Sequence, residues 1–283
     1  MKVFIDGELY DGKAGRIPVT DHGLLYGDGI FEGIRVFGGK AFLLEEHLGR
    51  MAHGMRALHL HLPAGLAGLR EAVEVTVRAH AQPESYVRLI VTRGDGALGV
   101  DPASCPVPRV ICMVDTVQIF SEENRRLGVS LATVSVRRPG ADVLDPRVKS
   151  LNYLNNALAR IESRQRGADE ALMLNGQGLV AEASVANVFV VHGERVSTPP
   201  TTDGALDGIT RGAVLGLARG AGFDAQERSL GRMDLFCADE VFLTGTGAGL
   251  VRVRSLDGEA IGGSRPDSVF ERLSQQYDAL TRA

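Results

Sequence analysis

Apolar residues in the first third of the chain recur at the spacing of a helix. Leu69, Val73 and Val77 follow one another at intervals of four residues, so they fall on one face of a predicted helix over 66–80. A second helix is expected over 45–60, directly before it.

The spacing then changes to that of β-strands. In the segment 85–92, Tyr86 and Arg88 are two residues apart and point to one face, while Val87 and its apolar neighbours point to the other. One face is therefore expected in the core and the other in a site. A second strand is predicted over 109–114, and Asp-Gly turns predict a hairpin over 3–10. These elements form a first α/β layer.

A polar stretch over 117–128 is the predicted interdomain linker, which divides the chain into domains over 1–116 and 129–283. The domain-size prior for 283 residues also favours two domains. In the second domain we expect strands over 129–136, 170–174, 187–192 and 240–244 and helices over 211–220 and about 267–280.

The helix expected after Lys149 has its own apolar series. Leu154, Leu158 and Ile161, with Leu151 before them, are spaced as one helical face, which predicts that this helix is anchored to a core. Its N-terminal turn is expected to hold Lys149 still.

Composition excludes several classes of function. The net charge of −4 is mild and Lys and Arg are scattered, so no nucleic-acid partner is indicated. No apolar run approaches the length of a membrane span, and the start breaks into a turn at Asp6-Gly7, so we expect a cytoplasmic protein. The three cysteines lack paired spacing and are expected as free, mostly buried thiols. His59 and His61 have no carboxylate or cysteine at ligand spacing, and no metal site is expected.

Three segments carry complementary chemistry. Lys149-Ser-Leu-Asn-Tyr153 offers an amine, Val180-Ala-Glu182-Ala offers a carboxylate among small apolar residues, and Gly208-Ile-Thr-Arg211 offers a helix start. A pyridoxal phosphate enzyme needs these three groups: a lysine for the aldehyde, a carboxylate for the ring nitrogen and backbone N–H groups for the phosphate.

These segments, together with Tyr26-Gly-Asp-Gly-Ile-Phe-Glu-Gly-Ile-Arg35, His47-Leu-Gly-Arg50 and Thr244-Gly-Thr-Gly247, resemble the class IV pyridoxal-phosphate aminotransferases, and within them the branched-chain amino acid aminotransferases. The resemblance runs from about Val3 to about Asp257. It implies an α/β fold with an N-terminal α/β sandwich and a C-terminal pseudobarrel carrying the Schiff-base lysine. It also implies a homodimer whose partner subunit helps to close the site.

The resemblance assigns the cofactor residues of a pyridoxal 5'-phosphate site. It implies that Lys149 is the catalytic Schiff-base lysine, which removes and returns the substrate's α-proton, and that Glu182 pairs with the pyridine nitrogen. Tyr153 is expected at the cofactor's phenolic oxygen, although many relatives have one more residue between lysine and tyrosine. The residues expected at the phosphate are Arg50, Ile209, Thr210 and Thr246.

The substrates implied are amino acids and 2-oxo acids, namely leucine, isoleucine or valine with 2-oxoglutarate. Arg88 is expected to bind the distal carboxylate of glutamate, and the backbone of Gly247 and Ala248 to bind the α-carboxylate. This turn departs from the commonest branched-chain pattern, Ala-Ala-Glu after the threonine. The other residues expected at the substrate are Tyr26, Phe31, Gly33, Arg35 and Tyr86.

Other activities remain open at this stage. A D-amino acid aminotransferase or an aminodeoxychorismate lyase shares the fold and cofactor, and fold alone does not fix the substrate. A non-catalytic cofactor carrier would bind the cofactor to Lys149 but would not convert amino donors. The Tyr86-Val-Arg88 strand and the segment ending at Arg35 favour the branched-chain activity.

Overall fold

The computed structural model describes residues 1–262 and 268–282, and the chain divides into two compact units. Unit 1 comprises Met1–Val117 and Val148–Asn152, and unit 2 comprises Gln118–Arg147 and Tyr153–Ala283. The short segment with Lys149 therefore belongs to unit 1, whereas the sequence had placed this lysine in the C-terminal domain.

Unit 1 is built on a six-stranded antiparallel sheet in the order β2-β1-β6-β5-β3-β4. Its strands are β1 (Lys2–Ile5), β2 (Glu8–Asp11), β3 (Gly29–Phe37), β4 (Lys40–Ala41), β5 (Ser85–Thr92) and β6 (Arg109–Asp115). Its helices are α1 (His22–Tyr26), α2 (Leu44–Ala57) and α3 (Gly65–His80), with a short 3-10 turn at Pro102–Ser104. The predicted hairpin, the two long helices and the two strands are confirmed.

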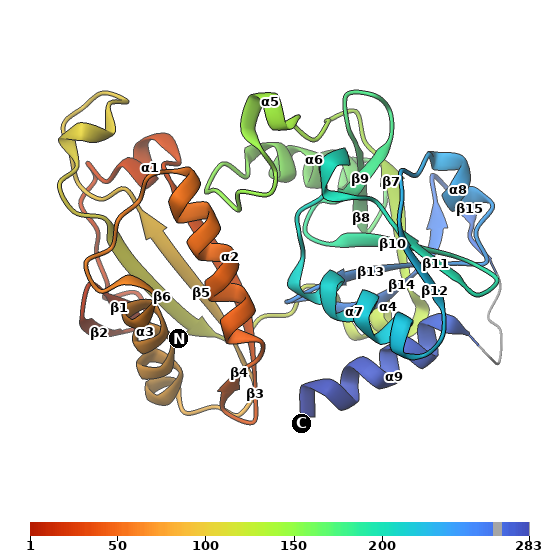
Figure 1. Ribbon diagram of the computed structural model, residues 1–283, viewed down its shortest axis with the longest axis horizontal. Helices are drawn as coiled ribbons and strands as arrows, with labels where there is room; N and C mark the ends of the chain where they lie inside the picture. Colours follow the sequence, from red (N-terminus) through yellow and green to blue (C-terminus); the bar gives the residue numbers. More distant parts are fainter. Residues whose placement is uncertain (263–267, 283) are drawn as a thin grey trace. The chain divides into compact units, whose positions relative to one another are not determined.

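Helices α2 and α3 cover one face of this sheet, as Figure 1 shows. Val87, Leu89 and Val91 of β5 are fully buried there and pack with apolar residues of α3 such as Leu69 and Val73. Strand β3 was not predicted as a strand. Its apolar residues alternate with glycine, glutamate and arginine, and this composition weakens the strand signal.

Unit 2 holds a nine-stranded sheet in the order β12-β11-β10-β13-β14-β7-β8-β9, with β15 paired to β14. Its strands are β7 (Val129–Thr133), β8 (Glu170–Leu174), β9 (Val180–Ala183), β10 (Asn187–His192), β11 (Arg195–Thr198), β12 (Asp224–Glu227), β13 (Glu240–Gly245), β14 (Gly249–Leu256) and β15 (Glu259–Ala260). Its helices are α4 (Glu122–Leu127), α5 (Ala141–Leu144), α6 (Leu154–Gln165), α7 (Ile209–Gly220), α8 (Arg232–Phe236) and α9 (Val269–Arg282), with a 3-10 turn at Thr201–Asp203.

The sheet of unit 2 curls toward a barrel. Strand β9 ends the sheet, yet it runs directly into β10 through a three-residue turn, and Ala183 N–H donates to the Ala186 carbonyl at 2.8 Å. Strand β10 is buried on both faces. Val188 and Val190 pack in the barrel interior, while Phe189 and Val191 pack against α7 and α9. An interior core with helices outside it is the arrangement of a pseudobarrel.

Helix α6 has the opposite orientation from the one its sequence predicts. The three apolar residues expected in the core, Leu154, Leu158 and Ile161, are 72%, 46% and 52% exposed. The buried face instead carries Asn156, Ala159 and Ser163. The prediction was wrong because Asn156 makes hydrogen bonds inside unit 2, and these bonds decide which face of the helix turns inward.

The segment predicted as a linker has structure of its own. Phe120 is buried in the core of unit 2, and α4 begins after Ser121, whose hydroxyl accepts a hydrogen bond from Asn124 N–H. Helix α9 begins at Val269, and the expected start near Asp267 lies outside the described residues. The thiols are less uniform than expected, because Cys112 is buried while Cys237 is exposed.

Candidate active site

Lys149 is held by the edge of strand β3. Phe31 N–H donates to the Lys149 carbonyl and Leu151 N–H donates to the Gly29 carbonyl, both at 2.9 Å, and Ile30 forms a β-bridge with Ser150. The prediction that the first turn of the following helix fixes Lys149 was therefore wrong. Pairing with β3 places the Lys149 side chain on the same face of the strand as Phe31.

The Phe31 ring contacts two basic side chains of unit 1. The Lys149 amine is 4.5 Å from the centre of the Phe31 ring, and the Arg88 guanidinium carbon is 4.4 Å from the same centre. The guanidinium is also 5.9 Å from the ring of Tyr86. Four of the predicted site residues thus share one face of the sheet of unit 1, opposite the face that α2 and α3 cover.

Gly33 makes room for the side chain of Tyr86. A Cβ atom at position 33 would lie 1.8 Å from the Tyr86 hydroxyl, so no larger residue fits without moving that ring. Arg35 pairs with Glu84 at 3.2 Å and lies 5.1 Å from the ring of Phe37. Gly33 therefore shapes the aromatic wall, and Arg35 lies at its outer end.

A cavity of about 410 Å³ lies beside Arg88. Side chains of β5 and β6 and the segment after β6 line it, namely Tyr86, Arg88, Ile90, Met113, Asp115, Thr116 and Val117. Its walls combine an aromatic ring, apolar side chains, the cation of Arg88, the carboxylate of Asp115 and a threonine hydroxyl. Such a lining accepts an aliphatic side chain and also a carboxylate near the guanidinium.

Arg50 contacts a carboxylate on the helix-covered face of the sheet. Its Nε and Nη2 donate to the two oxygens of Glu32 at 2.8 and 2.7 Å, and Nδ1 of His47 lies 2.8 Å from Glu32 Oε2. Burial raises the pKa of Glu32, but the charge of Arg50 and hydrogen bonds from His47 and Arg50 lower it to about 2. This ion pair holds the expected phosphate ligand Arg50 in one orientation.

Tyr26 makes a hydrogen bond and a ring contact within unit 1. Its hydroxyl accepts a hydrogen bond from Gly99 N–H at 2.8 Å, and its ring meets His22 edge-on at 4.9 Å. Among the described aromatic contacts, none joins Tyr26 to Phe31 or Tyr86. The role of Tyr26 at the substrate stays a prediction.

Glu182 is the centre of a buried polar network in unit 2. Its Oε2 accepts hydrogen bonds from Leu206 N–H at 2.9 Å and from Asn187 Nδ2 at 3.2 Å. Its Oε1 pairs with Arg138 Nη2 at 2.8 Å. The two oxygens of a carboxylate have about four lone-pair positions. Three of them have donors among the described residues, and the remaining one is on Oε1.

The start of helix α7 lies next to this network. Gly208 is its N-cap and supplies no side-chain hydrogen bond, so the N–H groups at Ile209 and Thr210 are available to an anion. A Cβ at Gly208 would lie 2.1 Å from Asn187 Oδ1, and Asn187 Nδ2 donates to the Leu206 carbonyl at 3.0 Å. Asn187 therefore ties Glu182 to the segment that leads into α7.

Thr246, Gly247 and Ala248 form the turn between β13 and β14. Arg125 of α4 donates to the Ala248 carbonyl at 3.0 Å, which fixes this turn from one side. Gly249 has a left-handed φ of 67°. This conformation favours glycine where the commonest branched-chain pattern has glutamate.

Two residues of the network were missed by sequence reasoning. Arg138 has no role in the sequence-based prediction, and Asn187 is only the first residue of the strand predicted over 187–192. No local sequence pattern predicts a role for Arg138. Asn187 could have been predicted as a site residue, because it is a polar residue at the start of the apolar strand β10. Tyr153 directly precedes α6, and its contact with the cofactor stays a prediction.

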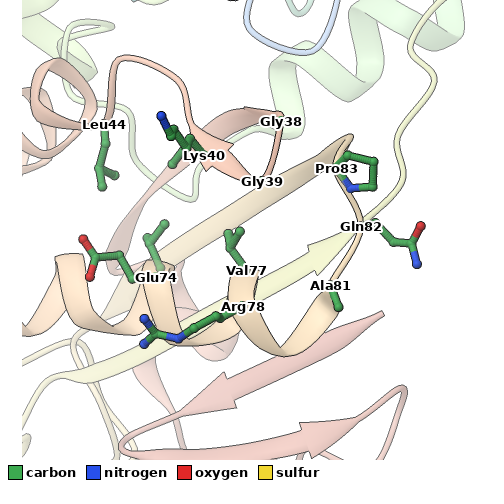
Figure 2. Close-up of a pocket in the computed structure, with 12 residues that line it drawn as sticks. Gly38, Gly39, Lys40, Leu44, Glu74, Val77, Arg78, Ala81, Gln82 and Pro83 are labelled. Carbon is green, nitrogen blue, oxygen red and sulfur yellow. The ribbon is translucent and has the colours of Figure 1, made fainter.

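A second cavity, of about 630 Å³, lies in unit 1 away from these residues. Helix α3, the turn between β3 and β4 and the segment after α3 line it, and Figure 2 shows its charged side chains Lys40, Glu74 and Arg78. No predicted site residue lines it, and all three charged side chains are exposed. The described residues contain neither a cluster of metal-ligating side chains nor a helix long and apolar enough to cross a membrane.

Each unit, taken by itself, holds groups that suit part of a phosphorylated pyridine. The acceptor position on Glu182 Oε1 suits a protonated ring nitrogen, and the open start of α7 suits a phosphate. Lys149 supplies an amine beside an aromatic ring.

Comparison with known proteins gives the same result. The family described as amino-transferase class IV matches residues 29–256. A putative branched-chain-amino-acid aminotransferase of Methanocaldococcus jannaschii is 40% identical over 277 residues, which cover 98% of this chain and 95% of that protein. The crystal structure of Escherichia coli branched-chain amino acid aminotransferase has a TM-score of 0.94 at 30% identity and covers 99% of this chain and 94% of that chain.

A third protein was crystallised with a bound ligand. The T.th. branched-chain amino acid aminotransferase, complexed with N-(5'-phosphopyridoxyl)-L-glutamate, has a TM-score of 0.91 at 32% identity and covers 99% of this chain and 94% of that chain. The structural matches confirm the expected α/β fold with a sandwich and a pseudobarrel. Since the family match spans most of the chain, the protein belongs to the class IV aminotransferases.

Proposed function

We propose that this protein transfers the amino group between branched-chain L-amino acids and 2-oxoglutarate. Its cofactor is pyridoxal 5'-phosphate, the group found with its class IV relatives. Transamination of branched-chain amino acids is the activity named for its relatives at 30% to 40% identity. We infer 2-oxoglutarate as the acceptor, and the role of each residue, from the chemistry of the residues described above.

The arrangement around Phe31 carries the proposal. Lys149 and Arg88 lie 4.5 and 4.4 Å from the ring centre, so the reactive amine and the guanidinium both lie against one aromatic side chain. An amino acid held against Phe31 and Tyr86 then has its α-carbon near the amine and its side chain toward the cavity beside Arg88. An aliphatic side chain is desolvated there, and glutamate places its distal carboxylate at the guanidinium.

The proton transfers are assigned to Lys149. Bound pyridoxal phosphate supplies the electron sink for the pair left when the α-proton departs. Lys149 Nζ takes the α-proton as a base and returns a proton as an acid, which are the two roles that one amine can fill in succession. Glu182 stabilises a proton on the ring nitrogen, and the start of α7 with Arg50 binds the phosphate.

A screen of half-reactions tests this function. The purified holoenzyme is mixed in turn with L-leucine, L-isoleucine, L-valine, L-glutamate and D-alanine, and the loss of the visible band of the lysine-bound cofactor is followed. We expect conversion by the four L-amino acids and none in Lys149→Ala. Conversion by D-alanine without L-leucine would move the protein to the D-amino acid branch. Failure of every amino donor, with pyruvate released from aminodeoxychorismate, would assign it as the lyase.

We also propose that the protein is a cytoplasmic homodimer. The exposed apolar residues of α6, Leu154, Leu158 and Ile161, support a protein contact, because such a group of side chains is unfavourable in water. Light scattering coupled to gel filtration should give about twice the mass of 30.2 kDa. Leu158→Asp should lower the mass if this face forms the contact, and cell fractionation tests the compartment.

A further inference from the structure

We propose that Arg138 is a positioning residue for the pyridine end of the cofactor and acts through Glu182. The inference rests on the proposed function, because it assumes that Glu182 meets the ring nitrogen. It adds a residue that sequence reasoning did not select, located in the segment before α5.

The guanidinium of Arg138 is fixed by three different parts of unit 2. Nη2 pairs with Glu182 Oε1 at 2.8 Å, Nη1 donates to Asn156 Oδ1 at 3.1 Å, and Nε donates to the Gly204 carbonyl at 3.2 Å. Arg138 itself is 6% exposed and Glu182 is 5% exposed. A planar guanidinium with all three nitrogens bound cannot rotate without losing a hydrogen bond.

Helix α6 orients Arg138 in turn. Asn156 donates from Nδ2 to the Ser184 carbonyl at 2.7 Å, so its Oδ1 is left to accept from Arg138. Helix α6 lies along β8 (Figure 1) and also contacts β7. Because the polar face of α6 is buried and its apolar face is exposed, Asn156 points inward, where it can accept the hydrogen bond from Arg138.

The remaining acceptor position of Glu182 is on the oxygen that Arg138 holds. Oε2 already accepts from Leu206 N–H and Asn187 Nδ2, and Oε1 accepts from Arg138. A protonated ring nitrogen bound by Glu182 is therefore expected to donate to Oε1, beside Nη2 of Arg138. The direction of this hydrogen bond then depends on Arg138.

Stability alone does not account for the pair. A buried ion pair loses hydration on both sides and is often no more stabilising than apolar residues of the same volume. Arg138 is a long cation turned into the interior beside a carboxylate. A role in holding that carboxylate for a ligand explains why the position carries arginine.

The test compares two cofactors on the apoprotein. Pyridoxal 5'-phosphate has the ring nitrogen, whereas 1-deazapyridoxal 5'-phosphate has a C–H group in its place and retains the aldehyde and phosphate. Equilibrium titration gives a Kd for each. We expect Arg138→Met to raise the Kd of pyridoxal phosphate by about 10- to 150-fold, the value of one charge-assisted hydrogen bond. The Kd of the deaza analogue should change little, because it makes no bond to Glu182.

Further variants define the route of the effect. Arg138→Lys retains the charge but not the three-nitrogen fork, so its Kd should be intermediate. In a Glu182→Gln background, Arg138→Met should not change the ratio of the two Kd values further, because the partner is already removed. Arg252→Met is the matched control. It breaks an arginine contact to the buried Glu240 elsewhere in unit 2 and should leave the ratio unchanged.

Equal losses for both cofactors in Arg138→Met would show that Arg138 only maintains the fold, and the inference would be rejected. Equal Kd values for both cofactors in the wild type would also reject it, because Glu182 would then contribute nothing at the nitrogen. If the wild type bound neither cofactor, the proposed function itself would fail. If Arg138→Met does not fold, the same ratio measured in Arg138→Lys and Asn156→Ala decides the question.

Discussion

Replacing Glu32 by glutamine removes the charge at the centre of a buried cluster in unit 1. Glu32 is 1% exposed and accepts hydrogen bonds from Arg50 at 2.8 and 2.7 Å, with His47 Nδ1 at 2.8 Å. Burial raises the pKa of Glu32, but Arg50 and His47 outweigh burial and lower it from 4.5 to about 2. The carboxylate therefore stabilises the folded protein in its charged form.

The shift gives the magnitude and the pH range. The difference between 4.5 and about 2 is about 2.5 pKa units, which corresponds to about 3 kcal/mol at about 1.4 kcal/mol per unit. Because the folded pKa lies below the unfolded value, this contribution is complete above about pH 4.5 and is lost as the pH falls toward 2. Glu32→Gln should therefore lower the free energy of unfolding by about 3 kcal/mol at neutral pH.

Urea unfolding followed by circular dichroism measures this difference. The difference in free energy of unfolding between wild type and Glu32→Gln should fall to about half by about pH 3. At that pH the solution is only about one unit above the folded pKa of Glu32, so only about one pKa unit of the shift still contributes. Glu45→Gln is the matched control. Glu45 lies on α2, the helix that carries Arg50, and it pairs with Arg70 on the exposed surface, where an ion pair contributes little to stability. An equal effect of the two substitutions, or a gap that does not depend on pH, would refute the reasoning.

Three further predictions concern the site. Lys149→Ala should reduce transamination by at least about 10²- to 10⁴-fold, the contribution of a positioned acid–base group, and borohydride reduction with peptide mapping of the wild type should label Lys149. A label on another lysine would overturn the assignment. Gly33→Ala should push the Tyr86 ring aside, because the new Cβ would lie 1.8 Å from its hydroxyl. We expect kcat/KM for leucine to fall about tenfold while the melting temperature changes little, and an unchanged kcat/KM would remove Tyr86 from the substrate wall. Arg88→Leu should slow the glutamate half-reaction by about 10- to 150-fold relative to leucine, because only glutamate places a charge at that guanidinium. Equal losses for the two substrates would show that Arg88 organises the whole site.

The sequence by itself determined the elements that follow from local periodicity. The alternation in β5 separates Val87 and Leu89 from Tyr86 and Arg88, and the structure confirms both faces. The helical spacing of Leu69 and its neighbours likewise predicted α3 and its buried side. These predictions succeed because residues that are close in the chain define each face, and the apolar face packs in a single hydrophobic core.

The sequence also supplied the residue types of the site through its motifs, but it did not determine their neighbours. Only the tertiary structure pairs Lys149 with β3, and only it places Glu32 between His47 and Arg50. Such contacts join segments that are far apart in the chain, so the local spacing of apolar residues does not predict them.

Helix α6 shows the difference most directly. Its apolar spacing predicted an anchored face of leucines, yet Asn156 and Ser163 turn inward. A buried amide that satisfies both its donor and its acceptor, here with Ser184 and Arg138, outweighs the pattern of the helix taken alone. Those partners come from segments outside the helix, so the orientation of α6 was decided only when the chain folded.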